Sequence, residues 1–149
     1  MPLKLSTRST YAIRAMMALA AGYGGPPQVA SEIAERQKLP ITYLEQILVA
    51  LRRSGLVVAT RGQHGGYSLA RPPEQITLAD VIEQTGGPVE LVDCPAVSGC
   101  CWQPESCALM ETWAEARRSV MGVLAKTTLA DVVKRQGEID QAVAVMYSI

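Results

Sequence analysis

The stretch LVVATRGQHGGYSLA, residues 56–70, decides the fold. Residues 56–60 are rich in β-branched side chains and predict one strand, and residues 66–70 predict its partner. The glycines between these strands make the connection a hairpin. The stretch lacks the GKS or GKT sequence of a Walker phosphate loop. It also differs from a dinucleotide fingerprint, whose glycines lead into a helix rather than a strand.

Three helices are predicted before this hairpin, over residues 10–22, 29–37 and 41–54. Ser9 or Thr10 is expected to cap the first helix. The apolar stripes are expected to contain Ile13, Met16, Met17 and Ala20 in the first helix, Val29, Ile33 and Ala34 in the second, and Leu44, Ile47, Leu48 and Leu51 in the third. Two short helices joined by a tight turn indicate a helix-turn-helix, and a following hairpin makes it a winged helix.

The predicted third helix has a polar face opposite its apolar stripe. This face carries Thr42, Tyr43, Glu45, Gln46, Arg52 and Arg53. Polar residues at a helix N-terminus suit contacts to base edges, and arginines one or two turns later suit phosphates. Arg61, at the base of the hairpin, could reach a phosphate or the minor groove. His64 at the hairpin tip is expected to be solvated or to touch a phosphate. An ordinary solvated helix face would carry the same residue types.

Charged groups are divided unevenly along a chain whose formal net charge is zero. Residues 1–72 contain nine lysines and arginines and three acids, a net charge of +6. The remaining residues contain five basic and eleven acidic groups, a net charge of −6. A basic half joined to an acidic half favours a polyanionic partner for the first half. Two unrelated solvated surfaces would give the same totals.

The second half of the chain predicts two capped helices and one long helix. Residues 71–75 form a stiff linker, and TLAD sequences at residues 77–80 and 128–131 are capping boxes that each start a helix. Residues 106–126 predict a long helix with an apolar seam of coiled-coil type, formed by Leu109, Trp113, Ala116, Val120 and Val123. This seam favours a dimer interface, with packing inside the monomer as the alternative.

The expected fold class is therefore mainly α with a small β-hairpin wing: a winged helix-turn-helix plus a long dimerisation helix. Residues 1–75 are expected to be the DNA-binding region. Residues 76–149 are expected to be the sensor and dimerisation region, packed as one compact unit.

Four cysteines, Cys94, Cys100, Cys101 and Cys107, follow the pattern C-x5-C-C-x5-C. The chain lacks the hydrophobic segments of a signal peptide or a membrane span, so we expect a cytoplasmic protein with no membrane partner. Clustered thiols in such a protein favour metal or redox chemistry over structural disulfides. Zinc sites usually pair ligands as C-x2-C, and this wider spacing better suits an iron–sulfur cluster. A redox disulfide or a zinc site remains the alternative. A thiol enzyme is disfavoured, because the only histidine lies in the predicted wing.

Together these motifs resemble the Rrf-two family of bacterial winged-helix regulators. The resemblance runs from about Leu3 to about Val133 and rests on KLSTRSTYAIRAMMALA, ITYLEQILVALRRSGLV, RGQHGGYSLAR and the cysteine pattern. It implies a homodimer on a two-fold operator in double-stranded DNA. Thr42, Glu45 and Gln46 match base-reading positions of the family, and Arg61 matches a wing arginine that enters the minor groove.

The resemblance also implies a cluster, either 2Fe–2S or 4Fe–4S, that controls a repressor in response to redox, iron–sulfur or nitric-oxide status. Cys94, Cys107 and either Cys100 or Cys101 match the ligands of cluster-binding members, with one extra residue inside the pattern. Members differ in the fourth ligand, and the two matching places here hold Met110 and Thr10. Neither side chain is a typical cluster ligand, so the spare cysteine of the adjacent pair is the simplest candidate.

Overall fold

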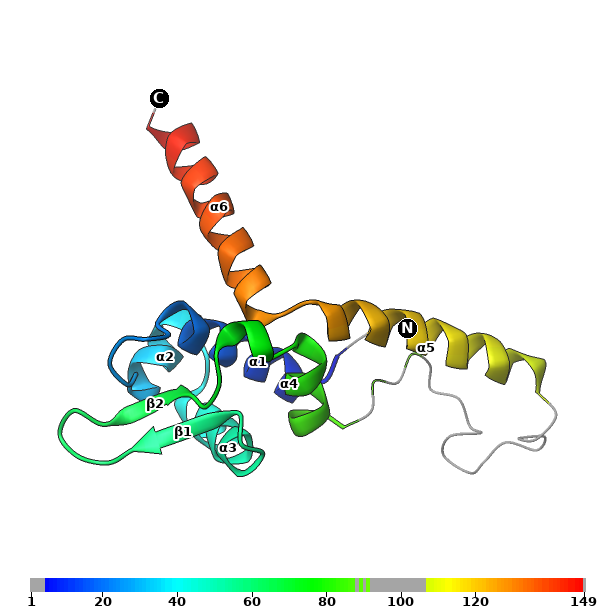
Figure 1. Ribbon diagram of the computed structural model, residues 1–149, viewed down its shortest axis with the longest axis horizontal. Coiled ribbons are helices and arrows are strands. Elements are labelled where there is room, and N and C mark those ends of the chain that lie inside the picture. The colour runs from blue at the N-terminus through cyan, green and yellow to red at the C-terminus, as the bar shows by residue number, and fades with distance from the viewer. Residues whose placement is uncertain (1–4, 88, 90, 92–106, 149) are drawn as a thin grey trace.

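The computed structural model describes residues 5–87, 89, 91 and 107–148. Its elements are α1 (Thr7–Ala21), α2 (Ala30–Gln37), α3 (Ile41–Arg53), β1 (Val57–Thr60), β2 (Gly66–Leu69), the 3₁₀ turn η1 (Pro73–Gln75), α4 (Leu78–Thr85), α5 (Ala108–Lys126) and α6 (Leu129–Tyr147). The prediction of a mainly helical chain with one small hairpin is confirmed. Figure 1 shows a body made of α1–α4 and the hairpin, from which α5 and α6 project in different directions.

Helix α1 runs through the body, and its start differs from the prediction. It begins at Thr7, and Ser6 is the N-cap, with its Oγ accepting from Ser9 N at 3.0 Å. Ser9, one of the two predicted caps, is instead buried inside the helix. The fully buried stripe consists of Ala12, Ala15, Met16 and Leu19, whereas Ile13 and Met17 are only half-buried. The small alanines on this face let the neighbouring helices approach closely. The spacing of large apolar residues does not reveal that these alanines are buried.

The helix-turn-helix consists of α2 and α3. The predicted stripe of α3 is confirmed, because Leu44, Ile47, Leu48 and Leu51 are all buried. The prediction that Val29 is buried is wrong: it is the N-cap of α2, and 44% of its surface is exposed. Helix α2 ends at Gln37, and its C-cap Lys38 has left-handed backbone angles of φ 52° and ψ 51°. This conformation turns the chain sharply toward α3.

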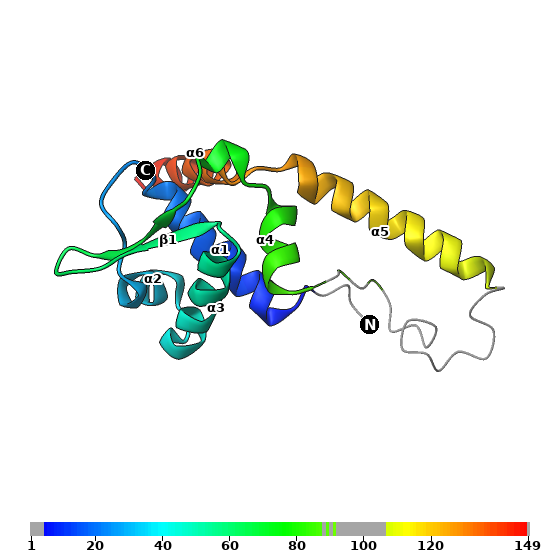
Figure 2. The same cartoon turned by 60° about the horizontal axis from the view of Figure 1, so that its bottom comes forward.

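The wing is the antiparallel hairpin of β1 and β2, with Val57 paired to Leu69 and Thr60 paired to Gly66. An isolated antiparallel bridge joins Tyr67 of β2 to Gln28, just before α2. The wing is therefore attached to the helix-turn-helix at its side as well as through the chain. It extends from the body on the side opposite α5 in both views (Figures 1 and 2).

The last three helices are α4, α5 and α6, and the sequence predicted a capping box at the start of α4 and of α6 and a long helix between them. Both boxes are confirmed, with Thr77 capping α4 and Thr128 capping α6. Helix α5 starts two residues later than predicted, at Ala108, and carries no fully buried residue. Helix α4 packs on α1 and α3, and α6 packs on α1 and η1 near its start. The functional division at residue 75 stays a prediction. Among the described residues, no helix is long and apolar enough to cross a bilayer.

Candidate nucleic-acid interface

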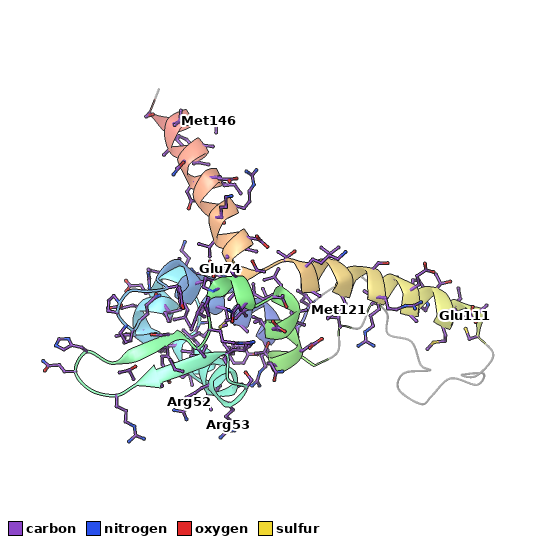
Figure 3. The ribbon with its side chains drawn as sticks, in the orientation of Figure 1. Arg52, Arg53, Glu74, Glu111, Met121 and Met146 are labelled. Carbon is purple, nitrogen blue, oxygen red and sulfur yellow. The ribbon has the colours of Figure 1, made fainter. Side chains whose placement is uncertain are left out.

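The exposed face of α3 presents most of the residues expected to read DNA. Its buried stripe faces α1 and α2, so the opposite side points into solvent. Thr42, Glu45 and Gln46 are all exposed on the first half of the helix. Arg52 and Arg53 are exposed in its last turn, and Figure 3 shows both beside the end of α3, pointing away from the body. The structure thus groups the five residues on one helix, as the sequence predicts.

Tyr43 has a different environment from the rest of this group. It is half-buried and packs against the core. Its ring meets that of Tyr11 edge to face, with centroids 5.6 Å apart and planes at 73°. Such aromatic pairs stabilise packing beyond the area they bury. The ring of Tyr43 therefore helps to hold α3 on α1, and a contact between Tyr43 and DNA stays a prediction.

The tip of the wing presents Arg61 and His64, both exposed. The turn between the strands is tight: a Cβ atom at Gly65 would lie only 2.2 Å from the carbonyl oxygen of Thr60. A bulkier residue at this place would force the hairpin apart. Arg61 directly follows the last residue of β1, so it lies at the outer end of the hairpin and not at its base as predicted. It stands on a thin projection, which is the shape a groove can admit.

The arginines of α3 and the wing are available to a polyanion. In the described part of the chain, the side chains of Arg52, Arg53 and Arg61 form no hydrogen bond or ion pair. The one ion pair among the described residues joins Arg135 to Glu138 on α6, at 2.7 Å. Unpaired guanidinium groups on an exposed face suit phosphate contacts, because no internal bond has to be broken first.

Gln28 is a positioning residue that the sequence analysis missed. Its main chain bonds to Tyr67 of the wing, and its Nε2 donates to Ala18 O of α1 at 2.9 Å. Its Oε1 also accepts from Arg36 Nη2 of α2. The main chain of Gln28 therefore holds the wing, and its side chain joins α1 to α2. A lone glutamine after two prolines carries no sequence signal for this role.

Only one of the four cysteines lies within the described residues. Cys107 is half-buried and is the N-cap of α5, and its side chain makes no capping hydrogen bond. Cys94, Cys100 and Cys101 lie outside the described residues, so their convergence stays a prediction. Within the described residues, no group of three or more potential ligands comes together. Thr10, at one candidate place for a fourth ligand, uses its hydroxyl to donate to Ser6 O at 3.1 Å.

Known proteins resemble this chain in both sequence and fold. Residues 5–135 match the Rrf2 family, described as iron-dependent transcriptional regulators. The protein rrf2 of Nitratidesulfovibrio vulgaris is 35% identical over 135 residues, which cover 89% of this chain and 88% of that protein. The structure of CymR, the global cysteine regulator of Bacillus subtilis, is 36% identical with a TM-score of 0.77, covering 90% of this chain and 98% of the other.

A second solved structure, IscR of T. potens, is 35% identical with a TM-score of 0.76 and covers 92% of this chain and 90% of that one. These matches span nearly the whole chain, including the helix-turn-helix, the wing and α5. The related proteins are named as regulators of transcription rather than as enzymes. With an exposed reading helix beside a basic wing, this chain belongs to the Rrf2 family of DNA-binding transcriptional regulators.

Proposed function

We propose that this regulator is a homodimeric repressor that binds a two-fold operator in double-stranded DNA, under the control of an iron–sulfur cluster. One observation carries the DNA-binding part: six polar side chains of α3 and the wing are exposed and form no hydrogen bond or ion pair among the described residues, namely Thr42, Glu45, Gln46, Arg52, Arg53 and Arg61. One α3 would enter the major groove of each half-site, with Thr42, Glu45 and Gln46 at the base edges. Arg61 would enter the adjacent minor groove, and Arg52 and Arg53 would contact phosphates.

The exposed apolar surface of α5 supports the homodimer. Leu109 and Val123, at the two ends of the predicted seam, are 59% and 65% exposed, and the three seam residues between them are half-buried. A helix gains most of its stability from packing its apolar face. Because α5 extends from the body in both views (Figures 1 and 2), a second copy of α5 is the partner that would cover this seam.

The chemistry of Cys107 fits an iron–sulfur cluster. Thiolates are the ligands that such clusters prefer, and the thiol of Cys107 is not used to cap α5. Cys94, Cys107 and one of the adjacent cysteines would hold the cluster, with the other cysteine as the candidate fourth ligand. When bound, a cluster supplies a centre that responds to oxidation, nitric oxide and iron supply. Cys107 is the N-cap of α5, so its binding to a cluster would affect where the proposed dimer helix is placed.

A cluster-free regulator is the second candidate function. The similarity to CymR, at 36% identity and a TM-score of 0.77, favours it, because that protein is named as a cysteine regulator. In this case the cysteines would form a reversible disulfide or hold zinc. The reading face, the wing and the dimer seam would be used in the same way. The two candidates differ only in what controls operator binding.

Metal analysis of anaerobically purified protein separates these two candidates. We expect iron and acid-labile sulfide in matching amounts, a visible absorption band, and operator binding that changes when the protein is exposed to air. Electron-paramagnetic-resonance spectra of the reduced protein then give the cluster type. Colourless protein without iron that binds its operator in a thiol-dependent way would favour the cluster-free candidate.

Selection of duplexes from a random library tests DNA reading itself. We expect an inverted repeat whose half-sites lie about one helical turn apart, 34–36 Å. Gln46→Ala should relax the selected sequence at one position in each half-site. Gln141→Ala is the matched control, because Gln141 is exposed on α6, far along the chain from the reading face. An unchanged consensus for Gln46→Ala would remove Gln46 from the reading set.

A further inference from the structure

The chain carries one short sequence twice, and the structure joins the two copies. Residues 77–82 are Thr-Leu-Ala-Asp-Val-Ile and residues 128–133 are Thr-Leu-Ala-Asp-Val-Val, so five of the six positions are identical. Each copy starts a helix, α4 or α6, with its threonine as the N-cap. Thr77 and Thr128 face each other in an isolated antiparallel bridge. We call this joint, residues 76–78 with residues 127–129, the clasp.

Main-chain hydrogen bonds close the clasp in both directions. Leu78 N donates to Thr127 O at 2.9 Å, and Leu129 N donates to Ile76 O at 2.9 Å. Both donors belong to the first residue of a helix, whose N–H group has no partner inside that helix. The capping threonines use their own groups differently, because each exchanges two bonds with the aspartate of its capping box. The clasp therefore satisfies donors that the capping boxes leave free.

Two side chains of the clasp reach into the core of the molecule. Ile76 and Leu129 are both fully buried. Leu129 is the one residue of α6 that is buried, and it belongs to the same apolar cluster as the helix-turn-helix. A joint with buried side chains and reciprocal bonds resists bending more than an exposed loop does. The clasp thus fixes the start of α6 to the DNA-reading body.

The clasp also fixes the end of α5, which stops at Lys126 just before Thr127. Helix α5 packs on α4 and carries no fully buried residue of its own. Figure 3 shows Met121 on the part of α5 nearer the body and Glu111 near its far end. Nineteen residues give the arm a length of about 28 Å, so a tilt of about 10° at the clasp moves its tip by about 5 Å. That movement exceeds the base-pair rise of about 3.4 Å.

We propose that the clasp sets the direction in which α5 leaves the reading body, and thereby the spacing between half-sites that the dimer accepts. This inference rests on the proposed function, because half-site spacing has meaning only for a dimer on a two-fold operator. Leu78 and Leu129 act here as positioning residues through their main-chain N–H groups. The clasp explains why the TLAD sequence occurs twice in the chain, because each copy must both cap a helix and pair with the other copy.

Leu78→Pro removes one clasp bond and leaves α4 able to form. Leu78 is the first residue of α4, where proline is tolerated. Thr77 before it has φ −93° and ψ 162°, the extended conformation that proline requires of its neighbour. Leu78→Ala is the matched control, because it loses the same side chain and keeps the N–H group. Circular dichroism and a sedimentation measurement confirm that each variant is folded and dimeric.

The readout is affinity for operators whose half-sites are separated by the selected spacer or by one base pair more or less. We expect Leu78→Pro to lose about fivefold or more of the wild-type preference for the selected spacer, and Leu78→Ala to keep it within about twofold. Affinity for a duplex with one half-site should stay within about twofold of wild type in both variants. Amide exchange at Leu129 should be faster in Leu78→Pro than in Leu78→Ala, which reports that the clasp has opened.

A second variant inserts one glycine between Lys126 and Thr127. The insertion leaves both capping boxes intact and loosens the link to α5, so we expect the same loss of spacer preference even if Leu78→Pro fails to fold. Full spacer preference in a folded Leu78→Pro or in the insertion variant would overturn the inference and leave the proposed function standing. Wild-type protein that binds single and double half-sites equally would instead defeat the proposed function.

Discussion

The main chains of Gln28 and Tyr67 bond to each other in both directions, with Gln28 N donating to Tyr67 O at 2.9 Å and Tyr67 N donating to Gln28 O at 2.8 Å. This bridge adds the segment before α2 to the edge of the wing. The reading helix and the wing therefore hold a fixed relation to each other. Gly66 lies directly beside the bridge, and a Cβ atom there would be 2.5 Å from the carbonyl oxygen of Gln28.

Gly66→Ala should detach the wing from the helix-turn-helix. The new methyl group meets main-chain atoms that cannot move away, and φ of 153° at this position is unfavourable for a side chain. We expect the free energy of unfolding to fall by about 2 kcal/mol or more, together with weaker operator binding. Urea denaturation and gel-shift titration measure the two effects.

Gly62→Ala is the control, because it shares a positive φ, 110°, and has open space around its Cβ position. The free energy of unfolding of Gly62→Ala should fall by about 1 kcal/mol, from backbone strain alone. Equal losses at Gly62 and Gly66 would show that the contact with Gln28 adds nothing.

Lys38→Gly should stabilise the protein. Lys38 is the one described residue other than glycine with a positive φ, and it ends α2 at the turn of the helix-turn-helix. A side chain in this left-handed conformation costs about 1 kcal/mol, so glycine should raise the free energy of unfolding by about 0.5–1 kcal/mol. Lys38→Ala retains the Cβ atom and should give no such gain. Denaturation curves in which the alanine variant matches the glycine variant would contradict this explanation.

Arg61→Ala should weaken operator binding by about 1–3 kcal/mol and relax any preference in the minor groove. The expected cause is the loss of an exposed, unpaired guanidinium group at the outer end of the wing. The salt dependence of binding should become shallower by about one counterion. Arg135→Ala, which removes an exposed arginine paired with Glu138 on α6, should leave both quantities unchanged. A gel-shift titration with equal affinity for wild type and Arg61→Ala would exclude the wing arginine from the interface.

Cys94→Ala should abolish the visible absorption of anaerobically prepared protein and leave its helical content near normal. This expectation rests on the predicted role of Cys94 as a cluster ligand, because losing a ligand thiolate removes the chromophore. Separate Cys100→Ser and Cys101→Ser variants should differ, because adjacent cysteines are poorly placed to bind one centre equally. A full spectrum in Cys94→Ala would remove that thiol from the ligand set.

Asp131→Asn should destabilise the protein near neutral pH and have less effect in acid. Hydrogen bonds from the main chain and side chain of Thr128 lower the pKa of Asp131 below its usual value of 3.8, and Lys134 lowers it further. Because the pKa of Asp131 is lower in the folded state, its ionised carboxylate stabilises the fold. This stabilisation is fully present above pH 3.8 and is lost as the pH falls through the folded pKa. Thermal melts at pH 7 and below pH 3 measure the difference.

Asp140→Asn is the matched control for Asp131→Asn, since Asp140 is exposed on the same helix and caps nothing. A melting-temperature loss in Asp131→Asn that is the same at both pH values would contradict the role of the ionised carboxylate. Loss of the α6 cap also weakens one side of the clasp, so amide exchange at Leu78 should increase in the same variant.

Local sequence rules predicted most of the elements in this chain. The stripe of α3, the hairpin strands and both capping boxes follow from spacing and residue type within a few positions. The exposed residues of α3 follow as well, because a buried stripe on one side of a helix places its polar residues on the other. The start of α1 and the burial of Val29 were mispredicted, since each depends on which neighbours the segment meets.

Tertiary structure alone decided three relations that the sequence does not display. Tyr43 turned toward Tyr11, Gln28 joined the wing to two helices, and Thr77 came to lie against Thr128. The pairs Tyr11–Tyr43, Gln28–Tyr67 and Thr77–Thr128 are each more than 30 positions apart, and their geometry is set by how the helices pack together. By itself, the sequence determined the secondary structure and the polar character of the reading face, because those depend on neighbours within one or two turns. The placement of the wing and of the α5 arm depends on contacts across the core, which no local pattern encodes.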